Sequence, residues 1–417
     1  MTWQMKNSGI SYFGDIPSHW QVMRNGYLFH NSKEIVIPNK DYQLLSLSTK
    51  GVREKDINEI GGKVPDNYNG YQIVHPRDMV MCLFDIDCSA VFSGLSNFYG
   101  MISPAYKILK CRSNILPEFA QYIFSYIGGK RLYKQYSKNL RYSLNIDDFM
   151  ALKLIVPPIN EQTAISDFLD TKCAEIDGLL EDLDKEVKIL TEYKKSIIAE
   201  TVTHGLNPNV SFISTTYGWI DKLPQHWELE KAKYAFTLRS TKGNTHNLEL
   251  LSPTQKYGVI PQSQLEGVVL VNEKTNLETF RTIHIGDFCI SLRSFQGGFE
   301  YSTYEGVVSP AYQVFYPTID VCDGYYKYLF KSDGFISKIN TFSMSLRDGK
   351  NIAFDDFGNM FIPVPPKDEQ IAIANYLDEK CKLIEESITE KLQQIEKLKE
   401  YKSSLIYEYV TGKKQVI

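Results

Sequence analysis

An internal repeat constrains the fold of this chain more than any other feature of its sequence. Short motifs return in the same order at an offset of 206 to 208 residues. Clear pairs are Ile16-Pro17-Ser18-His19-Trp20 with Leu223-Pro224-Gln225-His226-Trp227, and Glu192-Tyr193-Lys194 with Glu400-Tyr401-Lys402. So many ordered matches indicate a duplication, and we therefore expect two copies of one structural unit.

The two copies differ in their interiors. Residues 53–100 and 259–306 share little, although matching motifs flank both segments. A shared framework with divergent interiors suggests one scaffold that presents two different surfaces.

Each copy ends in a segment with the apolar spacing of a coiled-coil helix. From Leu169 to Thr201 the apolar positions alternate by four and three residues without a break, which is typical of a seam that packs on a partner helix. The second segment is weaker, because Lys391 stands where the first copy has Leu183. The predicted seam residues are Leu169, Ile176, Leu180, Leu183, Val187, Leu190, Ile197, Leu377, Ile384, Ile388, Ile395, Leu398 and Leu405.

The simplest partner for each seam is the other helix. A duplicated globule–helix chain closes most directly with its helices antiparallel under a pseudo-two-fold axis and its globular parts at opposite ends. The alternatives are that each helix packs on its own globular part or forms a homodimer. Candidate N-caps are Asn160 and Asp368, and candidate helix stops are Gly205 and Gly412.

These patterns predict an α+β protein with four segments. We expect a first globular domain at 1–158, a central coiled-coil helix at 159–206, a second globular domain at 207–366 and a distal coiled-coil helix at 367–417. The two domains should be mixed α/β: β-like runs at 78–84 and 287–292 are followed by helical stretches near 118–136 and 324–340.

The composition favours a cytoplasmic protein. No stretch approaches the roughly 20 apolar residues of a membrane span, and the first residues lack the apolar core of a signal peptide. The seven cysteines are scattered, which favours reduced thiols; Cys173 and Cys381 lie in the seams and are expected to be small core residues. The net charge of −4 is uneven: bases exceed acids by five in residues 1–160, and acids exceed bases by six in 161–206.

The motifs of self-contained enzymes are missing. The sequence has no phosphate-binding G-x-x-x-x-G-K-[ST] loop, no G-x-G-x-x-G and no H-E-x-x-H. We therefore expect no catalytic centre, no metal and no cofactor in this chain. His19 and His226, each beside a repeated tryptophan, are expected to pack or hydrogen-bond, and the pairs Asp147-Asp148 and Asp355-Asp356 to lie at turns or helix caps.

Two regions have the residue types that bind DNA. Residues 128–146 hold five basic side chains and three tyrosines without an acid, and the second copy has a basic set, including Lys331, that is diluted by Asp333 and Asp348. Basic groups neutralise phosphates, while Arg, Asn and Gln can bridge base edges. The candidate DNA-binding residues are Lys130, Arg131, Lys134, Lys138, Arg141, Tyr142, Lys256, Arg293, Ser294, Gln296, Arg347 and Lys350.

The whole chain resembles the specificity subunits of type I restriction–modification systems. The resemblance rests on residues 14–20 (Gly-Asp-Ile-Pro-Ser-His-Trp), 100–106 (Gly-Met-Ile-Ser-Pro-Ala-Tyr), 291–298 (Ser-Leu-Arg-Ser-Phe-Gln-Gly-Gly) and the Ile-Val-Pro-Pro of 155–158 before Glu161-Gln162. Their order, their duplication and their coupling to two heptad helices make the match specific.

This resemblance implies a division of labour. Each target-recognition domain would read one half of a bipartite site in double-stranded DNA. The helices would act as a ruler and dock two methyltransferase subunits, which bring S-adenosylmethionine and methylate adenine. A separate motor–nuclease subunit would join for restriction. The family also implies that Arg141, Arg293, Gln296 and Arg347 lie at the DNA face. The counterpart of the Arg293 loop in the first copy, residues 84–88, lacks arginine, so the base-reading role is not carried over there.

Two other classes of protein fit parts of the pattern. A scaffold with two peptide-binding domains on a coiled coil would share the architecture, and sequence-selective, salt-dependent DNA binding would exclude it. A self-contained modification enzyme would need the cofactor motifs that are missing.

Overall fold

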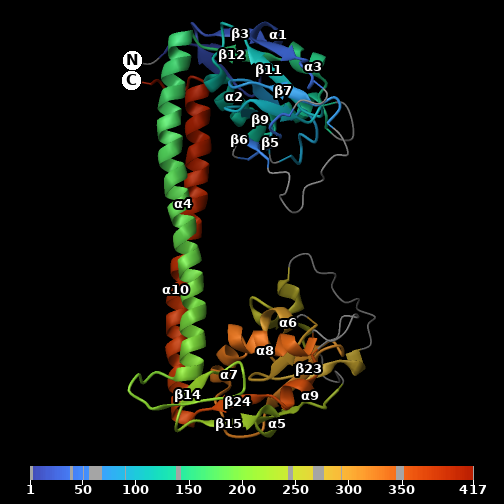
Figure 1. Cartoon of the computed structure of the whole chain (residues 1–417), viewed down its shortest axis with the longest axis vertical. Coiled ribbons are helices and arrows are strands. Elements are labelled where there is room, and N and C mark those ends of the chain that lie inside the picture. The colour runs from blue at the N-terminus through green and yellow to red at the C-terminus, as the bar shows by residue number, and fades with distance from the viewer. Residues whose placement is uncertain are drawn as a thin grey trace. The chain divides into compact units, whose positions relative to one another are not determined.

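The computed structural model describes residues 3–37, 41–49, 51–55, 68–89, 91–137, 142–242, 248–265, 277–292, 294–343 and 352–416. Its contacts divide the chain into two compact units. Unit 1 joins Met1–Asp184 with Gln393–Ile417, and unit 2 is Lys185–Leu392. The last part of the chain therefore belongs with the first copy of the repeat (Figure 1).

Unit 1 contains short strands and helices followed by one end of a long helix. The elements before that helix are β1 (Met5–Asn7), β2 (Asp15–Pro17), β3 (Gln21–Arg24), α1 (Asn25–Leu28), β4 (Phe29–Ser32), β5 (Leu45–Ser48), β6 (Gly51–Glu54), β7 (Gln72–Val74), β8 (Met79–Met81), β9 (Ser93–Leu95), β10 (Gly100–Ile102), β11 (Lys107–Cys111), α2 (Pro117–Gly129), η1 (Leu132–Tyr136), α3 (Ile146–Ala151) and β12 (Lys153–Val156).

A four-stranded antiparallel sheet, in the order β4-β11-β8-β9, organises unit 1. Side chains alternate across a strand, so β8 is covered on both faces. Met79 and Met81 lie in the core with Phe119 and the rest of the apolar side of α2, while Val80 lies in a second core with Val52 of the β5–β6 hairpin.

Unit 2 repeats this plan. Its elements between the long helices are β13 (Phe212–Ser214), β14 (Lys222–Pro224), β15 (Glu228–Lys231), α5 (Ala232–Ala235), β16 (Phe236–Leu238), β17 (Leu251–Thr254), β18 (Gly258–Pro261), η2 (Gln262–Gln264), η3 (Leu277–Thr279), β19 (Arg281–Ile283), β20 (Phe288–Ile290), α6 (Ser294–Gly297), β21 (Glu300–Tyr301), β22 (Gly306–Val308), β23 (Gln313–Pro317), α7 (Asp323–Leu329), α8 (Asp333–Ser343), α9 (Phe354–Gly358) and β24 (Phe361–Val364).

The sheet order β16-β23-β20-β21 matches that of unit 1 position by position. Phe288 of β20 faces a core with Phe330, and its neighbour Cys289 faces a second core with Val259 of the β17–β18 hairpin. The predicted fold class is confirmed: the chain is an internally duplicated α+β protein with two mixed domains and two long helices.

The two long helices are α4 (Ile159–His204) and α10 (Lys367–Val410). The predicted N-caps Asn160 and Asp368 were wrong by two residues: both lie inside the first turn, because each helix begins directly after a Pro-Pro pair. The predicted stops hold, since Gly205 and Gly412 adopt the left-handed backbone (φ +76° and +68°) that ends a helix.

Within each unit the helix segments run antiparallel. In unit 1, Phe168 contacts Tyr409 and Asp177 pairs with Lys402, so residue numbers rise along α4 where they fall along α10. In unit 2, Glu186 pairs with Lys391 and Lys194 with Glu385 in the same opposed order. The side chains at the predicted seam positions are buried or half-buried.

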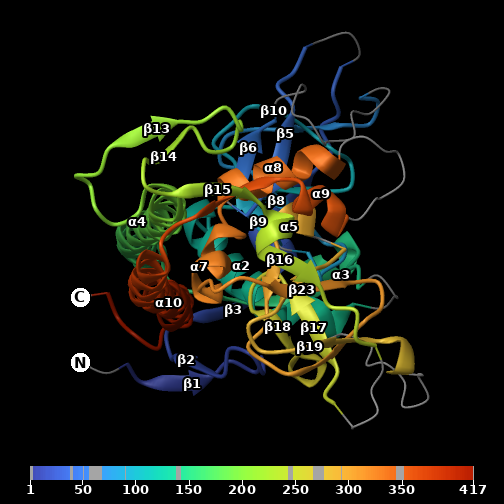
Figure 2. The ribbon, with the colours of Figure 1, turned by 90° about the horizontal axis from the view of Figure 1, so that it is seen from below.

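Both chain termini lie in unit 1, close to one another (Figures 1 and 2). Lys413, just after α10, donates a hydrogen bond to the backbone carbonyl of Asp15. Among the described helices, none is both long enough and apolar enough to cross a membrane.

Candidate nucleic-acid interface

In unit 1 the end of the basic segment 128–146 lies against loop 83–88, which is the counterpart of the Arg293 loop. Leu144 N–H donates to Leu83 O over 2.8 Å and Ile86 N–H to Tyr142 O over 3.3 Å. This pairing holds the chain at 142–144 alongside loop 83–88. The Nζ of Lys134 lies 4.4 Å from the centre of the Tyr142 ring, so one candidate cation is stacked on one candidate aromatic.

The same region concentrates strained backbone. Arg131, Tyr142 and Asp85 all have positive φ, of 52°, 44° and 50°, where residues other than glycine are uncommon. Arg131 sits at the break between α2 and η1, so the predicted helical stretch 118–136 is two helices and not one. Strained non-glycine residues gather at functional sites, which supports this surface as the one that unit 1 presents to a ligand.

Lys130, Arg131 and Lys134 are exposed at this surface. Asp85 and Asp87 of the neighbouring loop are half-buried beside them, and their charge reduces the attraction for phosphate. Two further candidates, Lys138 and Arg141, lie outside the described residues.

In unit 2 the corresponding surface is built by α6 and the β17–β18 hairpin. The Nε2 of Gln255 lies 3.4 Å from the Oε1 of Gln296, and a Cβ at Gly297 would be 3.0 Å from Gln255 Cγ. The hairpin tip therefore touches the α6 turn, and the exposed Lys256 and Gln296, more than 35 residues apart in sequence, belong to one surface. Sequence reasoning missed Gln255; the tight turn before Gly258 was the signal for it.

Ser294 has a different role from its neighbour Gln296. Its side chain is 1% exposed, and its hydroxyl oxygen accepts the N–H of Ser291 over 2.8 Å. Ser294 therefore shapes the turn from inside and is not placed to touch a ligand. Arg293, Arg347 and Lys350 lie outside the described residues.

The basic set of the second copy is not wholly available to bind phosphate. Lys331 donates to the buried Glu300 over 2.6 Å and to the backbone carbonyl of Gly297 over 2.9 Å. Lys327, four residues earlier, pairs with Asp378 over 2.7 Å. The sequence alone could not show these ion pairs, because the partner of Lys331 lies 31 residues away and that of Lys327 lies 51 residues away.

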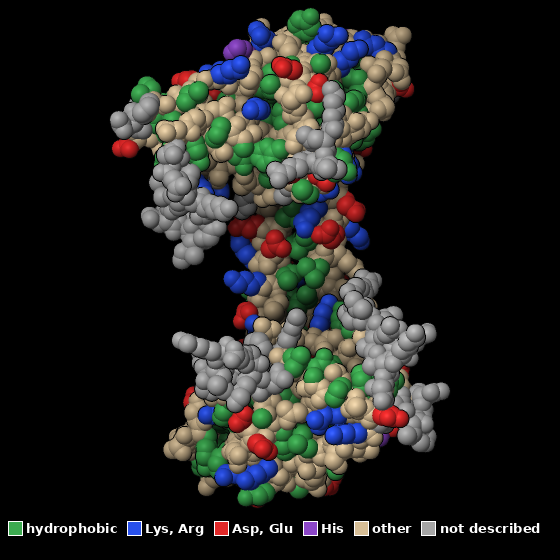
Figure 3. All heavy atoms as spheres, turned by 90° about the vertical axis from the view of Figure 1, so that its right-hand side faces the viewer, with side chains coloured by type: hydrophobic (Ala, Val, Ile, Leu, Met, Phe, Trp, Pro, Cys, Tyr) green, Lys and Arg blue, Asp and Glu red, His purple; other side chains and the backbone are tan. Residues whose placement is uncertain are grey.

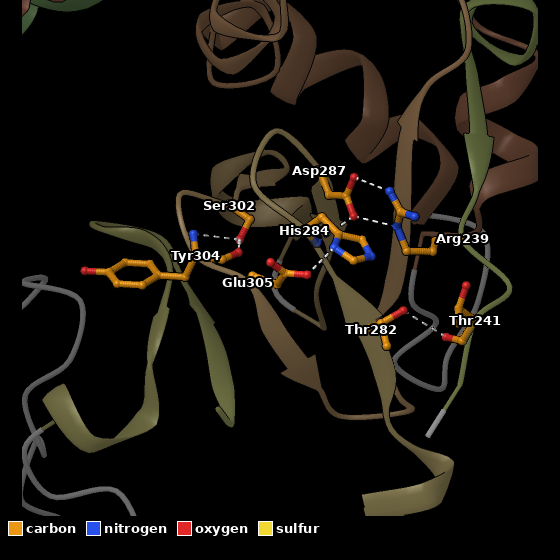
Figure 4. Close-up of polar contacts among 8 residues, drawn as sticks. All are labelled: Arg239, Thr241, Thr282, His284, Asp287, Ser302, Tyr304 and Glu305. Atoms are coloured by element: carbon orange, nitrogen blue, oxygen red, sulfur yellow. Dashed lines mark hydrogen bonds and ion pairs between the residues drawn. The ribbon is translucent and has the colours of Figure 1, made fainter. Parts of the chain in front are cut away.

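A partly buried ion pair joins the ends of two strands in the sheet of unit 2 (Figure 4). Arg239, which follows β16, donates two hydrogen bonds of 2.6 and 2.7 Å to Asp287 at the start of β20. Asp287 also accepts the backbone N–H of His284, and the ring of His284 contacts Glu305. In unit 1 the residue equivalent to Asp287 is Asp78, which accepts the backbone N–H of His75. The residue equivalent to Arg239 is Ser32, so unit 1 lacks this ion pair. Burial raises the pKa of Asp78.

The repeated His-Trp motif ties each domain to a long helix. Glu161, in the first turn of α4, accepts the indole N–H of Trp20 at 2.9 Å and contacts His19 at 2.7 Å. Glu369 of α10 does the same for Trp227 and His226, at 3.0 and 2.6 Å. The expectation that these histidines serve packing and hydrogen bonding is confirmed.

The paired aspartates are also helix-terminal, as expected. Asp147 and Asp148 lie in the first turn of α3, where Asn145 caps the backbone N–H of Asp148. Asp355 and Asp356 lie in the first turn of α9. In the described part of the chain, no group of three or more His, Cys, Asp or Glu side chains could hold a metal ion.

The surface charge is mixed. On the face drawn in Figure 3, the Lys and Arg side chains of the described residues are interspersed with acidic, polar and apolar ones in each unit. This agrees with the net charge of −4 and indicates that attraction to phosphate alone is modest.

Comparison with known proteins shows what the chain is similar to. The family model for the type I restriction modification DNA specificity domain matches residues 224–397. The putative type I restriction enzyme MjaX specificity subunit of Methanocaldococcus jannaschii is 24% identical over 439 residues, covering 97% of this chain and 95% of that protein. The MjaVIII specificity subunit of the same organism is 23% identical over 234 residues, 54% of this chain and 51% of that protein.

Solved structures support the fold. A chain from a structural study of complex assembly and conformational transition of the type I R-M system matches with a TM-score of 0.67 at 13% identity, over 95% of this chain and 98% of its own length. The HsdS subunit from Thermoanaerobacter tengcongensis matches with a TM-score of 0.50 at 14% identity, over 95% of this chain and 98% of its own.

Both of these relatives are named as specificity subunits of type I restriction enzymes. Residues 224–397 belong to the family of type I restriction modification DNA specificity domains. With its first copy folded on the same plan, the chain is similar over nearly its whole length to a specificity subunit of the type I restriction–modification class, the resemblance that its sequence predicted.

Proposed function

We propose that the two copies read the two halves of a bipartite target in double-stranded DNA. The observation that carries this proposal is the pairing of one scaffold with two different loops at equivalent places. Loop 83–88 follows β8 in unit 1 as α6 follows β20 in unit 2. Loop 83–88 pairs with residues 142–144, whereas α6 contacts the β17–β18 hairpin. Two surfaces on one framework suit a target with two unlike halves.

The proposed contacts fall into two groups. Arg131, Lys134 and Tyr142 serve the first half-site, with Lys130, Lys138 and Arg141 as further candidates. Lys256 and Gln296 serve the second, with Arg293, Arg347 and Lys350. Gln and Arg have the donor geometry to bridge base edges, whereas lysines suit phosphates. Ser294 supports the turn from within. The target-recognition domains proposed at 1–158 and 207–366 contain these two groups.

We also propose that α4 and α10 dock two methyltransferase subunits. Large apolar side chains are exposed along both helices, which suits a protein partner better than water. They include Leu179, Ile189 and Tyr193 of α4, and Leu383, Leu392 and Tyr401 of α10. S-adenosylmethionine would be held by the methyltransferase, a motor–nuclease subunit would join for restriction, and the complex would act in the cytoplasm.

Methylome sequencing tests the proposal. Cells that express the chain with its methyltransferase should carry one new methylated motif with two specified halves around unspecified base pairs. Cells that express either protein alone should carry none. A single uninterrupted motif, or the same methylation without this chain, would contradict the proposal.

A further inference from the structure

The α6 turn of unit 2 is tied to the core by one half-buried lysine. The Nζ of Lys331 donates to the carbonyl oxygen of Gly297 over 2.9 Å and to Oε2 of Glu300 over 2.6 Å. The side chain of Glu300 is 1% exposed and that of Lys331 is 26% exposed. A single cation thus joins the end of α6, the strand β21 and the junction between α7 and α8.

The turn is closely packed on two further sides. Gly298 has a φ of +75°, and a Cβ there would overlap the carbonyl oxygen of Phe330. On its other side, Gly297 contacts Gln255 of the hairpin that carries Lys256. Gln296 therefore sits on a turn that packs against α8 and the end of α7 and is bonded to Lys331.

This ion pair belongs to unit 2 alone. Glu300 pairs with Cys289 across β20–β21, as Gly94 pairs with Val80 across β8–β9. A Cβ at Gly94 would lie 2.5 Å from the Leu47 side chain, which leaves no room for a glutamate. The backbone N–H of Cys322 in unit 2 donates to Gln370, and that of Leu116 in unit 1 donates to Gln162, so Cys322 and Leu116 are equivalent. Lys331 comes nine residues after Cys322. The residue nine positions after Leu116 is Ser125.

A buried ion pair contributes little net stability compared with apolar side chains of the same size. Removing two charges from water has a large desolvation cost, and apolar residues of similar size often stabilise as well or better. Moreover, Oε1 of Glu300 has no hydrogen-bond partner among the described residues. A pair that adds little stability and holds one turn in one position suits a role in specificity.

Resting on the proposed function, we infer that Lys331 and Glu300 are positioning residues that set the base preference of the second domain by holding the Gln296 turn. They act through the backbone of Gly297 and do not touch DNA. Without the Lys331 ammonium, the Gly297 carbonyl loses its donor and the turn can settle in more than one position.

The test compares Lys331→Met with the double variant Lys331→Met/Glu300→Gln in the full chain with its methyltransferase. The single variant leaves a buried carboxylate unpaired and should lower the melting temperature. The double variant removes both charges and should recover much of that loss. Selection from DNA randomised at both half-sites should nevertheless show about tenfold weaker discrimination at one half-site in both variants, with the other half-site unchanged.

Lys367→Met is the matched control, because it also removes one cation of unit 2, from an exposed pair with Asp320; its selection profile should equal that of the wild type. A folded double variant with wild-type preference at both half-sites overturns the inference, and so does equal loss at both. If the single variant does not fold, the double variant decides. If the wild-type complex selects no bipartite sequence, both the proposed function and this inference are contradicted. If the wild-type complex selects a bipartite sequence and the variants select the same one with equal preference, only this inference is contradicted.

Discussion

Trp227 donates its indole N–H to Glu369 over 3.0 Å, although 142 residues separate them. The bond joins the start of the second domain to the first turn of α10. Trp20 and Glu161 repeat it in unit 1 at 2.9 Å. In each copy, the domain's opening motif is thus bonded to the helix that ends the copy.

Loss of this bond should destabilise its own unit. Glu161→Ala leaves the indole N–H of the buried Trp20 unsatisfied, so we expect a loss of about 2 kcal/mol in the free energy of unfolding. Glu161→Gln keeps an acceptor and should cost about half as much. Glu175→Ala, which breaks an exposed pair with Lys172, is the control and should cost under about 0.5 kcal/mol. Urea unfolding followed by tryptophan fluorescence measures all three; equal losses for Glu161→Ala and Glu175→Ala would refute the assignment.

The buried Glu300 should make stability depend on pH. Burial raises the pKa of its carboxyl from 4.5 to about 7, although Lys331 lowers it in part. The folded chain therefore keeps a proton that the unfolded chain releases near pH 4.5. The stability from this proton is present below pH 4.5 and is lost as the pH rises through 7.

Glu300→Gln removes this titration. Relative to the variant, the wild type should lose roughly 3 kcal/mol of unfolding free energy between pH 4.5 and pH 8. Thermal unfolding of both proteins across that range measures the difference, and a constant difference would show that Glu300 titrates normally.

Lys391 interrupts the seam of α10 and pairs with Glu186. Its side chain is 27% exposed, so a leucine there would bury apolar surface against α4. We expect Lys391→Leu to stabilise unit 2 by about 1 kcal/mol. Lys382→Leu, at a position 76% exposed, should change the melting temperature little. A lower melting temperature for Lys391→Leu would mean that the ion pair matters more than the seam.

Arg293 directly precedes α6 in sequence and lies outside the described residues. If it bridges a base, Arg293→Ala should cost about 1–3 kcal/mol at one base pair of one half-site. Lys256→Ala should instead weaken binding to all sequences and reduce the salt dependence by about one ion. Binding assays of the methyltransferase complex at several salt concentrations separate the two, and a uniform loss for Arg293→Ala would make it a phosphate contact.

The helices should set the spacing between the two half-sites. Inserting seven residues into both α4 and α10 keeps their seams in phase and adds roughly 10 Å at 1.5 Å per residue. The original spacing should then no longer be methylated, while each half-site preference persists wherever binding survives. Methylome sequencing provides the readout. A folded variant that binds methyltransferase and still modifies the original site fully would exclude a ruler role.

Local patterns predicted much of this protein. The repeat, the seam spacing from Leu169 to Thr201, the helix stops at Gly205 and Gly412, and the β-like runs at 78–84 and 287–292 all depend on residues near in sequence. Helical periodicity and the left-handed preference of glycine are properties of short segments, so they can be read without the fold. The family motifs likewise lie in continuous stretches.

Other features were decided only by tertiary structure. The sequence showed Lys331 as a free cation and Ser294 as a possible DNA contact, but Glu300 neutralises the first and burial inside its turn removes the second from the surface. Charge and apolar spacing specify that a side chain needs a partner; which partner it meets depends on strands and helices far apart in the chain, and only the fold brings these together.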